Sequence, residues 1–360
     1  MQDNNKKIII INLMTLIIIA LIQNYIQQLA QQLRKFKNIT SLQLDLSGNE
    51  ICEEDIFYIG QALRELTNVT CLSLDLSGND IFNQSAWYIC QAIGQMKNLN
   101  QLSLNFQFCE ISEQGSEYIS QLLKEVNNIT KLKLILGDNE VSDQGSQYIS
   151  KALQQMKNIT QLALSLSGNR FSDQGVRYIS EALIEMKNIA QLELFLGGNQ
   201  ISDQGTLFIT KALKQMKGTT QLVLQLNRNK ITVQGAKYIS QALIEMKNVK
   251  QLSLDLMGNK ICDQGVMYIS QALIQMENIT QLGLQLGFND ISDQGVEHIT
   301  QALNQMKYVT KLLLFLNNQL IEQVSRPPSK NIFSPLEYSK MENLKYQFIV
   351  PNLGKISRVD

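Results

Sequence analysis

The chain has 360 residues, of which 44% are hydrophobic, and its 32 Lys and Arg balance its 32 Asp and Glu. This hydrophobic content suffices for a large folded core and excludes a disordered chain. The absence of net charge argues against a general nucleic-acid binder or a protein held on anionic lipid, and a single His excludes a His-rich metal cluster.

The first feature in chain order is an apolar run over residues 8–22, preceded by Lys6 and Lys7. The run is shorter than the ~18–20 apolar residues of a membrane-spanning helix. It has the basic start and core length of a signal peptide, but no small-residue cleavage site follows Ala20. We prefer a cap that covers the first unit of the downstream fold, and a signal peptide or membrane anchor is the alternative.

From about residue 38 the sequence repeats every 30 residues without an insertion. Such a strict period is typical of a solenoid and not of an ordinary globular domain. The register is marked by one leucine in each unit: Leu42, Leu72, Leu102, Leu132, Leu162, Leu192, Leu222, Leu252, Leu282 and Leu312.

Each unit changes its hydrophobic period midway. Alternation of leucines with small or polar residues over 162–166 predicts a strand with one buried face. An apolar stripe between Tyr178 and Met186 predicts a helix. Ser172 and Asp173 suit the start of that helix, because a hydroxyl accepts from free backbone amides and a carboxylate favours the positive end of the helix dipole.

These residues resemble the leucine-rich repeat family, and within it the cytosolic ribonuclease-inhibitor-like class. The likeness is carried by the pattern L-x-L-x-x-N-x-[IVF] followed by G-x-x-[YF]-I-x-x-A-L, which recurs over about residues 38–319. The 30-residue unit is longer than the about 20–29 residues common in the family. The ligand contacts of known members therefore cannot be carried over by position.

The resemblance implies a ladder of asparagines along the solenoid. A buried amide in this place satisfies the turn carbonyl and N–H groups of its own and the next unit, which are costly to bury without a partner. Cys109 replaces one rung, and Gln319 replaces the last. The predicted rungs are Asn49, Asn79, Asn139, Asn169, Asn199, Asn229, Asn259 and Asn289.

The predicted fold is an α/β leucine-rich repeat solenoid. Parallel strands stack about 4.8 Å apart whereas packed helices need about 8–10 Å, so the stack must curve with the sheet on its concave face and the helices on its convex face. We divide the chain into an apolar segment and helix (1–37), ten strand-bearing units (38–319) and a non-repeating tail (320–360) that holds all four prolines.

The sequence shows no catalytic or metal-binding constellation. The five cysteines are scattered without the spacing of a metal site, which suits a reducing compartment. His298 replaces the tyrosine of other units, so we expect it to face the core rather than to act as a base. We therefore expect no enzymatic activity, no metal and no cofactor.

Phe57 and Trp87 stand in a helix column that is polar or charged in most other units. Burial of two aromatic side chains would stabilise the fold by about 1.5–3 kcal/mol each. We therefore expect residues 8–22 to shield them.

The best candidates for a binding site are the variable positions on the outward side of the strands and at the strand ends. Aromatic and Arg side chains are typical of binding hot spots. As exposed side chains, Phe195 and Phe315 should be removable with a change in stability of no more than about 0.5 kcal/mol. The candidate residues are Phe108, Ile135, Glu193, Phe195, Arg228, Asp255, Phe288 and Phe315.

We interpret the chain as a non-enzymatic scaffold that binds a protein partner on its concave face. One alternative is a regulator of a small GTPase, similar in fold to Ran GTPase-activating protein, although no activating residue is identified. A second is the ligand-sensing part of a receptor, although the sequence has no G-x-x-x-x-G-K-[ST] motif. We expect a cytoplasmic monomer without a nucleic-acid partner and without membrane contact except through residues 8–22. Secretion or anchoring through that run is the alternative.

Overall fold

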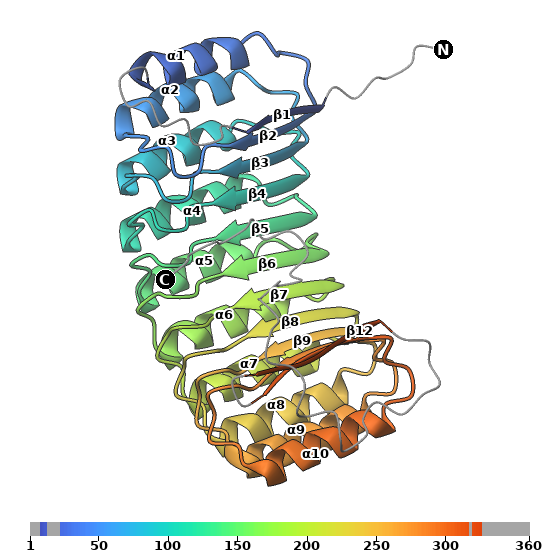
Figure 1. Ribbon diagram of the computed structural model, residues 1–360. Helices are drawn as coiled ribbons and strands as arrows, with labels where there is room; N and C mark the ends of the chain where they lie inside the picture. Colours follow the sequence, from blue (N-terminus) through green and yellow to red (C-terminus); the bar gives the residue numbers. More distant parts are fainter. Residues whose placement is uncertain (1–7, 13–21, 317–318, 326–360) are drawn as a thin grey trace, which may run out of the picture.

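The structure is a computed structural model that describes residues 8–12, 22–316 and 319–325. Strands and helices alternate along the chain (Figure 1). The strands are β1 (Ile8–Asn12), β2 (Ser41–Asp45), β3 (Cys71–Asp75), β4 (Gln101–Asn105), β5 (Lys131–Ile135), β6 (Gln161–Ser165), β7 (Gln191–Phe195), β8 (Gln221–Gln225), β9 (Gln251–Asp255), β10 (Gln281–Gln285), β11 (Lys311–Leu316) and β12 (Gln319–Ser325). The helices are α1 (Ile22–Leu33), α2 (Glu53–Arg64), α3 (Asn83–Ile93), α4 (Glu113–Glu125), α5 (Asp143–Leu153), α6 (Asp173–Glu185), α7 (Asp203–Gln215), α8 (Val233–Glu245), α9 (Cys262–Gln275) and α10 (Asp293–Gln305).

All of these strands belong to one sheet and follow each other in chain order. The strands from β1 to β11 run parallel, and the leucine columns lie in register, with Leu42 paired to Leu72. β1 pairs Ile9 with Leu42, a step of 33 residues where later units step by 30. β12 turns back and pairs antiparallel to β11, with a shift of register between Leu314 and Phe315.

β1 extends the sheet beyond β2, at the end of the solenoid where we expected a cap. Residues 13–21, the greater part of the apolar run, lie outside the described residues. A helix of the length and hydrophobicity needed to cross a membrane is absent from the described part of the chain.

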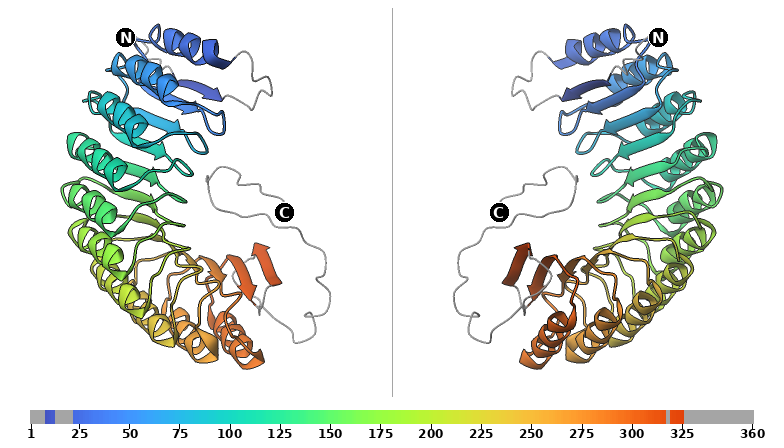
Figure 2. Two further views of the ribbon diagram at one scale, coloured as in Figure 1. Left: turned by 90° about the vertical axis from the view of Figure 1, so that its left-hand side faces the viewer. Right: turned by 90° about the vertical axis from the view of Figure 1, so that its right-hand side faces the viewer.

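The solenoid is curved, with the sheet on its concave face and the helices on its convex face (Figure 2). The different spacings of packed strands and packed helices account for this curvature. The predicted fold class is confirmed.

The hydrophobic core lies between the sheet and the helices and continues from unit to unit. In one unit, Leu162 and Leu164 of β6 and Ile179 and Leu183 of α6 are each at most 1% exposed. Every unit contributes the same columns, so stacking buries surface that a single unit would leave in water. Burial of one such side chain stabilises the fold by about 1.5–3 kcal/mol.

Asn79 shows the contacts of a typical rung of the asparagine ladder. Its Oδ1 accepts from the backbone N–H groups of Asn49 and Ile51, both at 3.0 Å. Its Nδ2 donates to the carbonyls of Leu46 at 2.9 Å and Leu76 at 2.8 Å. One side chain thus joins two units and satisfies buried backbone groups in both.

Two rungs of this ladder are weaker. Cys109 donates from Sγ to the carbonyl of Leu76 at 3.3 Å, a poor substitute for an amide. Asn199 donates from Nδ2 to the carbonyls of Leu166 at 3.0 Å and Leu196 at 3.1 Å, but its buried Oδ1 has no hydrogen-bond partner among the described residues. Asn49 and Asn229 are half-buried, and the buried rungs are Asn79, Asn139, Asn169, Asn199, Asn259 and Asn289.

A second ladder, which we did not predict, joins the starts of neighbouring helices. Asp143 of α5 accepts at Oδ1 from the N–H groups of Ser172 and Gly175, both at 2.8 Å. Its Oδ2 accepts from the hydroxyl of Ser172 at 2.8 Å. Each carboxylate therefore satisfies free N–H groups at the start of the next helix, where negative charge is favoured. The same contacts to the next unit's Ser or Thr are made by Asp173, Asp203 and Asp263.

Val233 breaks the aspartate ladder, because its side chain has no acceptor. The helix of the next unit, α9, begins at Cys262 rather than at Asp263, and Cys262 has a φ of +48°. The corresponding residue Thr232 has a φ of −108° and caps its helix from Oγ1. Loss of the carboxylate therefore goes with a changed start of the following helix.

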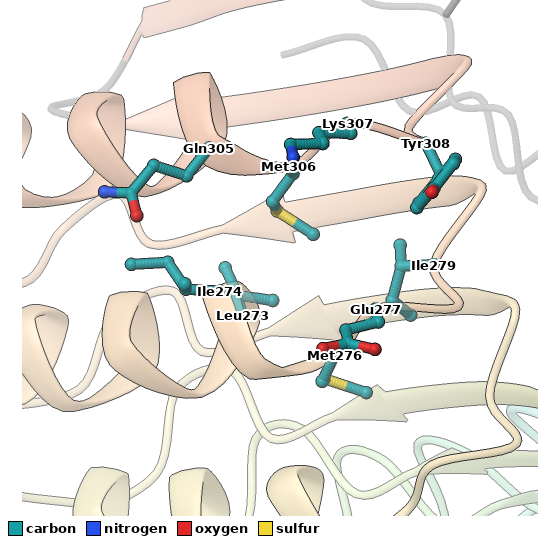
Figure 3. A pocket seen from close by; sticks show the side chains of 9 residues that line it. All are labelled: Leu273, Ile274, Met276, Glu277, Ile279, Gln305, Met306, Lys307 and Tyr308. Carbon is teal, nitrogen blue, oxygen red and sulfur yellow. The ribbon is translucent and has the colours of Figure 1, made fainter.

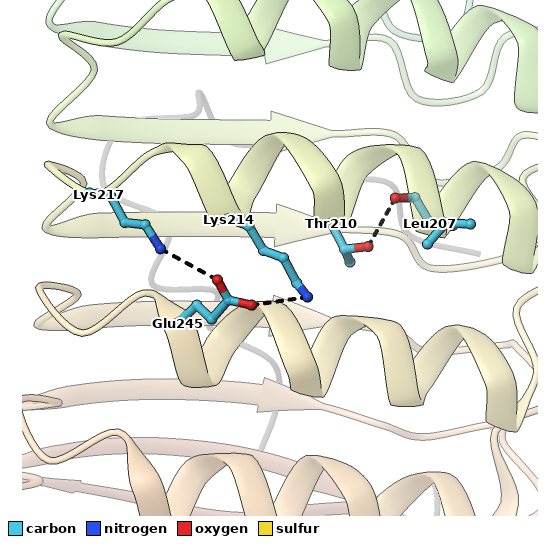
Figure 4. Close-up of polar contacts among 5 residues, drawn as sticks. All are labelled: Leu207, Thr210, Lys214, Lys217 and Glu245. Carbon is cyan, nitrogen blue, oxygen red and sulfur yellow. Dashed lines mark hydrogen bonds and ion pairs between the residues drawn. The ribbon is translucent and has the colours of Figure 1, made fainter.

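Exposed ion pairs join neighbouring helices on the convex face. The carboxylate of Glu245 on α8 lies 3.0 Å from Nζ of Lys214 and 3.4 Å from Nζ of Lys217, both from the α7 side (Figure 4). The hydrogen bond from Lys214 is the main reason that the pKa of Glu245 is lowered. Exposed ion pairs such as those of Glu245 contribute little to stability individually. Within α7, Thr210 donates to the carbonyl of Leu207 at 3.1 Å.

His298 is half-buried, as are Tyr118, Tyr148 and Tyr178 at the same position of other units. The expected shielding of Phe57 and Trp87 is not seen for the described part of the run, because Phe57 remains 39% exposed and β1 lies in the sheet rather than over the helices. Residues 13–21 lie outside the described residues. The reason for the aromatic pair is a cluster across α2 and α3, in which Tyr88 packs edge-on against Phe57 at 5.3 Å and against Trp87 at 5.1 Å between ring centroids.

Candidate functional site

A row of turns just beyond the C-terminal ends of the strands forms what we call the rim, made up of the residue at the position of Gly48 in each unit. Its backbone φ lies between +52° and +66°, the left-handed region that favours glycine. A larger residue there costs roughly 1–2 kcal/mol. The rim glycines are Gly48, Gly78, Gly168, Gly198 and Gly258, and the other members are Phe108, Asp138, Arg228 and Phe288.

The four larger rim side chains are all exposed. Phe108 and Phe288 leave 56% and 61% of their surfaces in water, although an exposed ring gains nothing from burial. Strained backbone combined with exposed aromatic or charged side chains is typical of a binding surface, because stability alone would select glycine.

Rim glycines make room for the larger side chains of the preceding unit. Cγ of Arg228 lies 3.3 Å from the point where a Cβ on Gly258 would stand. The carboxylate of Asp138 lies over Gly168 in the same way, and it accepts from Nε2 of Gln107 at 2.9 Å. The rim therefore carries projecting side chains in some units and only glycine backbone in others.

The floor of the concave face differs from the sequence prediction. Ile135, Phe195, Asp255 and Phe315 were expected to stand exposed, and this expectation is wrong, because they are only 7%, 4%, 7% and 8% exposed. Parallel strands lie about 4.8 Å apart and the sheet bends toward this side, so side chains on neighbouring strands cover one another. Phe195, for example, lies in register between Ser165 and Gln225.

Two half-buried opposite charges stand on this floor. Lys133 of β5 and Glu193 of β7 lie in register on either side of Ala163 of β6. Burial lowers the pKa of Lys133 and raises the pKa of Glu193, and the attraction between the two opposes both shifts. The small alanine between them leaves the space across which these charges interact.

Asp255 connects the floor to the rim. Burial raises the pKa of its carboxyl to about 6, while the N–H of Met257, which donates to Oδ1 at 3.0 Å, and the nearby Arg228 oppose this shift. The candidate residues Arg228, Asp255 and Phe288 therefore come from three consecutive units. Phe315 on β11 belongs to the unit that follows Phe288, whereas Phe108 lies several units away, at another place on the arc.

The described residues contain no group of three or more His, Cys, Asp or Glu placed to hold a metal ion.

A groove of about 360 Å³ lies between the C-terminal ends of α9 and α10, away from the rim (Figure 3). Here Tyr308 replaces an asparagine, and the asparagine of the preceding unit, Asn278, donates to the carbonyl of Lys247 at 2.8 Å.

Residues 158–180, 252–270 and 284–299 match the family model described as Leucine Rich repeat. These stretches share their register with the other units, and the chain is a leucine-rich repeat protein. Membership of the ribonuclease-inhibitor-like class stays a prediction. A search of curated proteins found no significant match.

Among the solved structures, a similar chain is an internalin C2 from Listeria monocytogenes, with 18% sequence identity and a TM-score of 0.43. The similarity covers 81% of this chain and 92% of the internalin chain.

Proposed function

We propose that the protein is a non-enzymatic scaffold that binds a protein partner through its concave face and the rim. Leucine-rich repeat proteins commonly act as interaction scaffolds, and an extended concave surface suits this role. The observation that carries the proposal is the rim, where Phe108 and Phe288 keep a left-handed backbone and yet expose their rings. The other candidates, Ile135, Glu193 and Phe195 among them, shape the floor beneath this rim.

The test uses replacements that remove the ring and relieve the backbone together. Phe108→Gly and Phe288→Gly should leave the free energy of unfolding unchanged or raise it by up to about 1 kcal/mol. The same variants should capture less of the partner from a lysate of the source cells, measured by quantitative mass spectrometry of proteins retained on the immobilised chain. A matched control is Phe82→Ser, because Phe82 is 48% exposed at the start of α3 and has a φ of −96°. Full capture by both rim variants would contradict the proposal.

We also propose a reducing, cytoplasmic location. All five cysteines are free thiols, and burial raises the pKa of the Cys109 thiol to about 12, which suits an inert structural thiol. The Asn-x-Thr motifs have a structural use, since Asn68 and Asn278 donate from Nδ2 to the preceding unit. A mass loss on endoglycosidase treatment of the native protein would contradict this location and favour secretion.

A further inference from the structure

A second column of side chains follows the rim, at the position of Glu50 in each unit, and we call it the charged edge. Its backbone is stacked in register, because Glu140, Lys230 and Lys260 donate from N–H to carbonyls of the preceding unit at 3.0, 2.8 and 2.8 Å. All of its members are exposed. In chain order they are Glu50, Asp80, Glu110, Glu140, Arg170, Gln200, Lys230, Lys260 and Asp290.

The charged edge is divided by sign, although the whole chain has no net charge. Its first four members are acidic, the next four are three cations and one amide, and the ninth, Asp290, is acidic and lies beyond this pattern. Like charges at the same position of neighbouring units repel each other. At the boundary Arg170 and Glu140 form an ion pair at 3.1 Å, with 75% and 53% of the side chains exposed. The order of charges is therefore unfavourable in an isolated chain.

We propose that the charged edge binds a second copy of this chain, antiparallel to the first, about a two-fold axis between Glu140 and Arg170. Such an axis makes the contact self-complementary, because each pair occurs twice. This proposal rests on the proposed function, because it identifies a second copy of the chain as one protein partner of the rim and of the charged edge beside it. The facing residues are Glu50 with Lys260, Asp80 with Lys230, Glu110 with Gln200, and Glu140 with Arg170 of the second copy.

The curvature of the solenoid permits this contact over its full length. The solenoid forms an arc (Figure 2). Rotation by 180° about an axis along the radius of that arc leaves a second copy curved around the same centre. The turns that follow the strands then meet along the whole stretch from Glu50 to Lys260. A straight or oppositely curved partner would touch only part of this edge.

The rim fits the same rotation independently of the charges. Two of its larger side chains, Phe108 and Arg228, would each face a left-handed glycine with no side chain over it, whereas Asp138 would face Gly168, which the Asp138 of that copy already covers. Phe288 lies beyond the matched stretch. The facing rim residues are Phe108 with Gly198, Asp138 with Gly168, and Arg228 with Gly78 of the second copy.

The affinity of such a dimer depends on salt. Each exposed ion pair contributes little, so the contact relies on their number and on their common register. Charges at a surface are screened over about 8 Å at physiological ionic strength and over about 3 Å at 1 M. Sedimentation velocity of the purified full chain should show a dimer at low ionic strength that dissociates in high salt.

Charge reversal tests the register directly. Glu50→Lys with Asp80→Lys makes both ends of the edge basic, and Lys230→Glu with Lys260→Glu makes both ends acidic. Each double variant alone should dimerise at least about tenfold more weakly than the wild type, because like charges face each other. An equimolar mixture of the two should form a heterodimer with about the wild-type affinity, since all of its outer pairs again have opposite charge. The control Lys151→Glu with Lys187→Glu carries the same charge change at exposed positions off the edge and should leave the dimer unchanged.

A wild-type chain that stays monomeric at low salt, or a mixture that fails to associate, would overturn the two-fold contact. If either double variant, measured on its own, dimerised as tightly as the wild type, the contact would lie elsewhere and the two-fold contact would also be overturned. The proposed function is tested apart from this by Phe288→Gly, which lies outside the matched stretch. A monomeric chain whose capture of another protein depends on Phe288 would contradict the dimer and leave the scaffold proposal standing.

Discussion

Asp143 and Ser172 lie 29 residues apart in the chain and are joined by two hydrogen bonds of 2.8 Å, one from the backbone N–H and one from the hydroxyl of Ser172 to the carboxylate. The contact links the start of one helix to the start of the next. Through it and its equivalents, the helices are held in register by charge-assisted hydrogen bonds, as the strands are by the asparagine ladder.

The aspartate ladder should matter for stability. Asp203→Ala should lower the free energy of unfolding by about 1–3 kcal/mol, because Thr232 and Gly235 at the start of α8 lose a charged acceptor. Asp293→Ala is the matched control. Its helix, α10, is the last described helix, so no described helix follows whose first N–H groups could donate to Asp293. Chemical denaturation measures both, and equal effects would contradict the ladder.

The natural gap in this ladder offers the reverse change. Val233→Asp should supply the missing acceptor to the start of α9 and raise the free energy of unfolding by about 0.5–1 kcal/mol. Hydrogen exchange at the first amides of α9 should slow at the same time. Faster exchange or a lower denaturation midpoint would contradict the idea that an aspartate at position 233 stabilises the start of α9.

The strands and helices could be predicted because each depends on residues close together in the sequence. Leucines two residues apart predict β6, and the stripe from Tyr178 predicts α6. The partner of Asp143 stands in another unit, so its residue type alone indicated only a favourable helix start. The recurrence of an aspartate directly after a serine, as in Ser142–Asp143, Ser172–Asp173 and Ser202–Asp203, was the signal for a contact between units. β1 was not predicted as a strand, because Ile9 precedes Leu42 by 33 residues and so does not fit the 30-residue repeat.

The asparagine ladder should be uneven in strength. Asn169→Leu should lower the free energy of unfolding by about 2 kcal/mol, because it leaves the N–H of Val141 and the carbonyl of Leu136 without partners. Asn199→Leu should cost about 1 kcal/mol less, because the Oδ1 of Asn199 has no partner to lose. Denaturant titrations of the two variants under one condition give the comparison. A larger loss for Asn199→Leu would contradict it.

Replacement of Phe195 should destabilise the protein. The ring is only 4% exposed, so Phe195→Ala should lower the free energy of unfolding by about 3 kcal/mol, where an exposed position would change it by no more than about 0.5 kcal/mol. Phe108→Ala, at an exposed position with positive φ, is the comparison of equal size. A thermal denaturation midpoint unchanged in Phe195→Ala would show that the ring is not packed.

The exposed positions were the least predictable part of the candidate site. Alternation along a strand indicates which side chains leave the core, but Phe195 and Phe315 leave it on the inner side of a bend, where neighbouring strands cover them. The turns gave the better signal. Phe108, Arg228 and Phe288 stand where other units have glycine, and this is visible in the sequence once the units are aligned.

The stability of the protein should depend on the ionisation of Asp255. Burial raises the pKa of this carboxyl from 3.8 to about 6, so the folded state binds the proton more tightly than the unfolded state. The resulting stabilisation is complete below about pH 4 and is lost as the pH rises through about 6, a difference of ~3 kcal/mol. Asp255→Asn stays neutral at every pH and should therefore gain stability relative to the wild type between about pH 4 and 7. Urea denaturation at several pH values measures the gap between the two proteins, and a gap that stays constant across this range would show that Asp255 titrates normally.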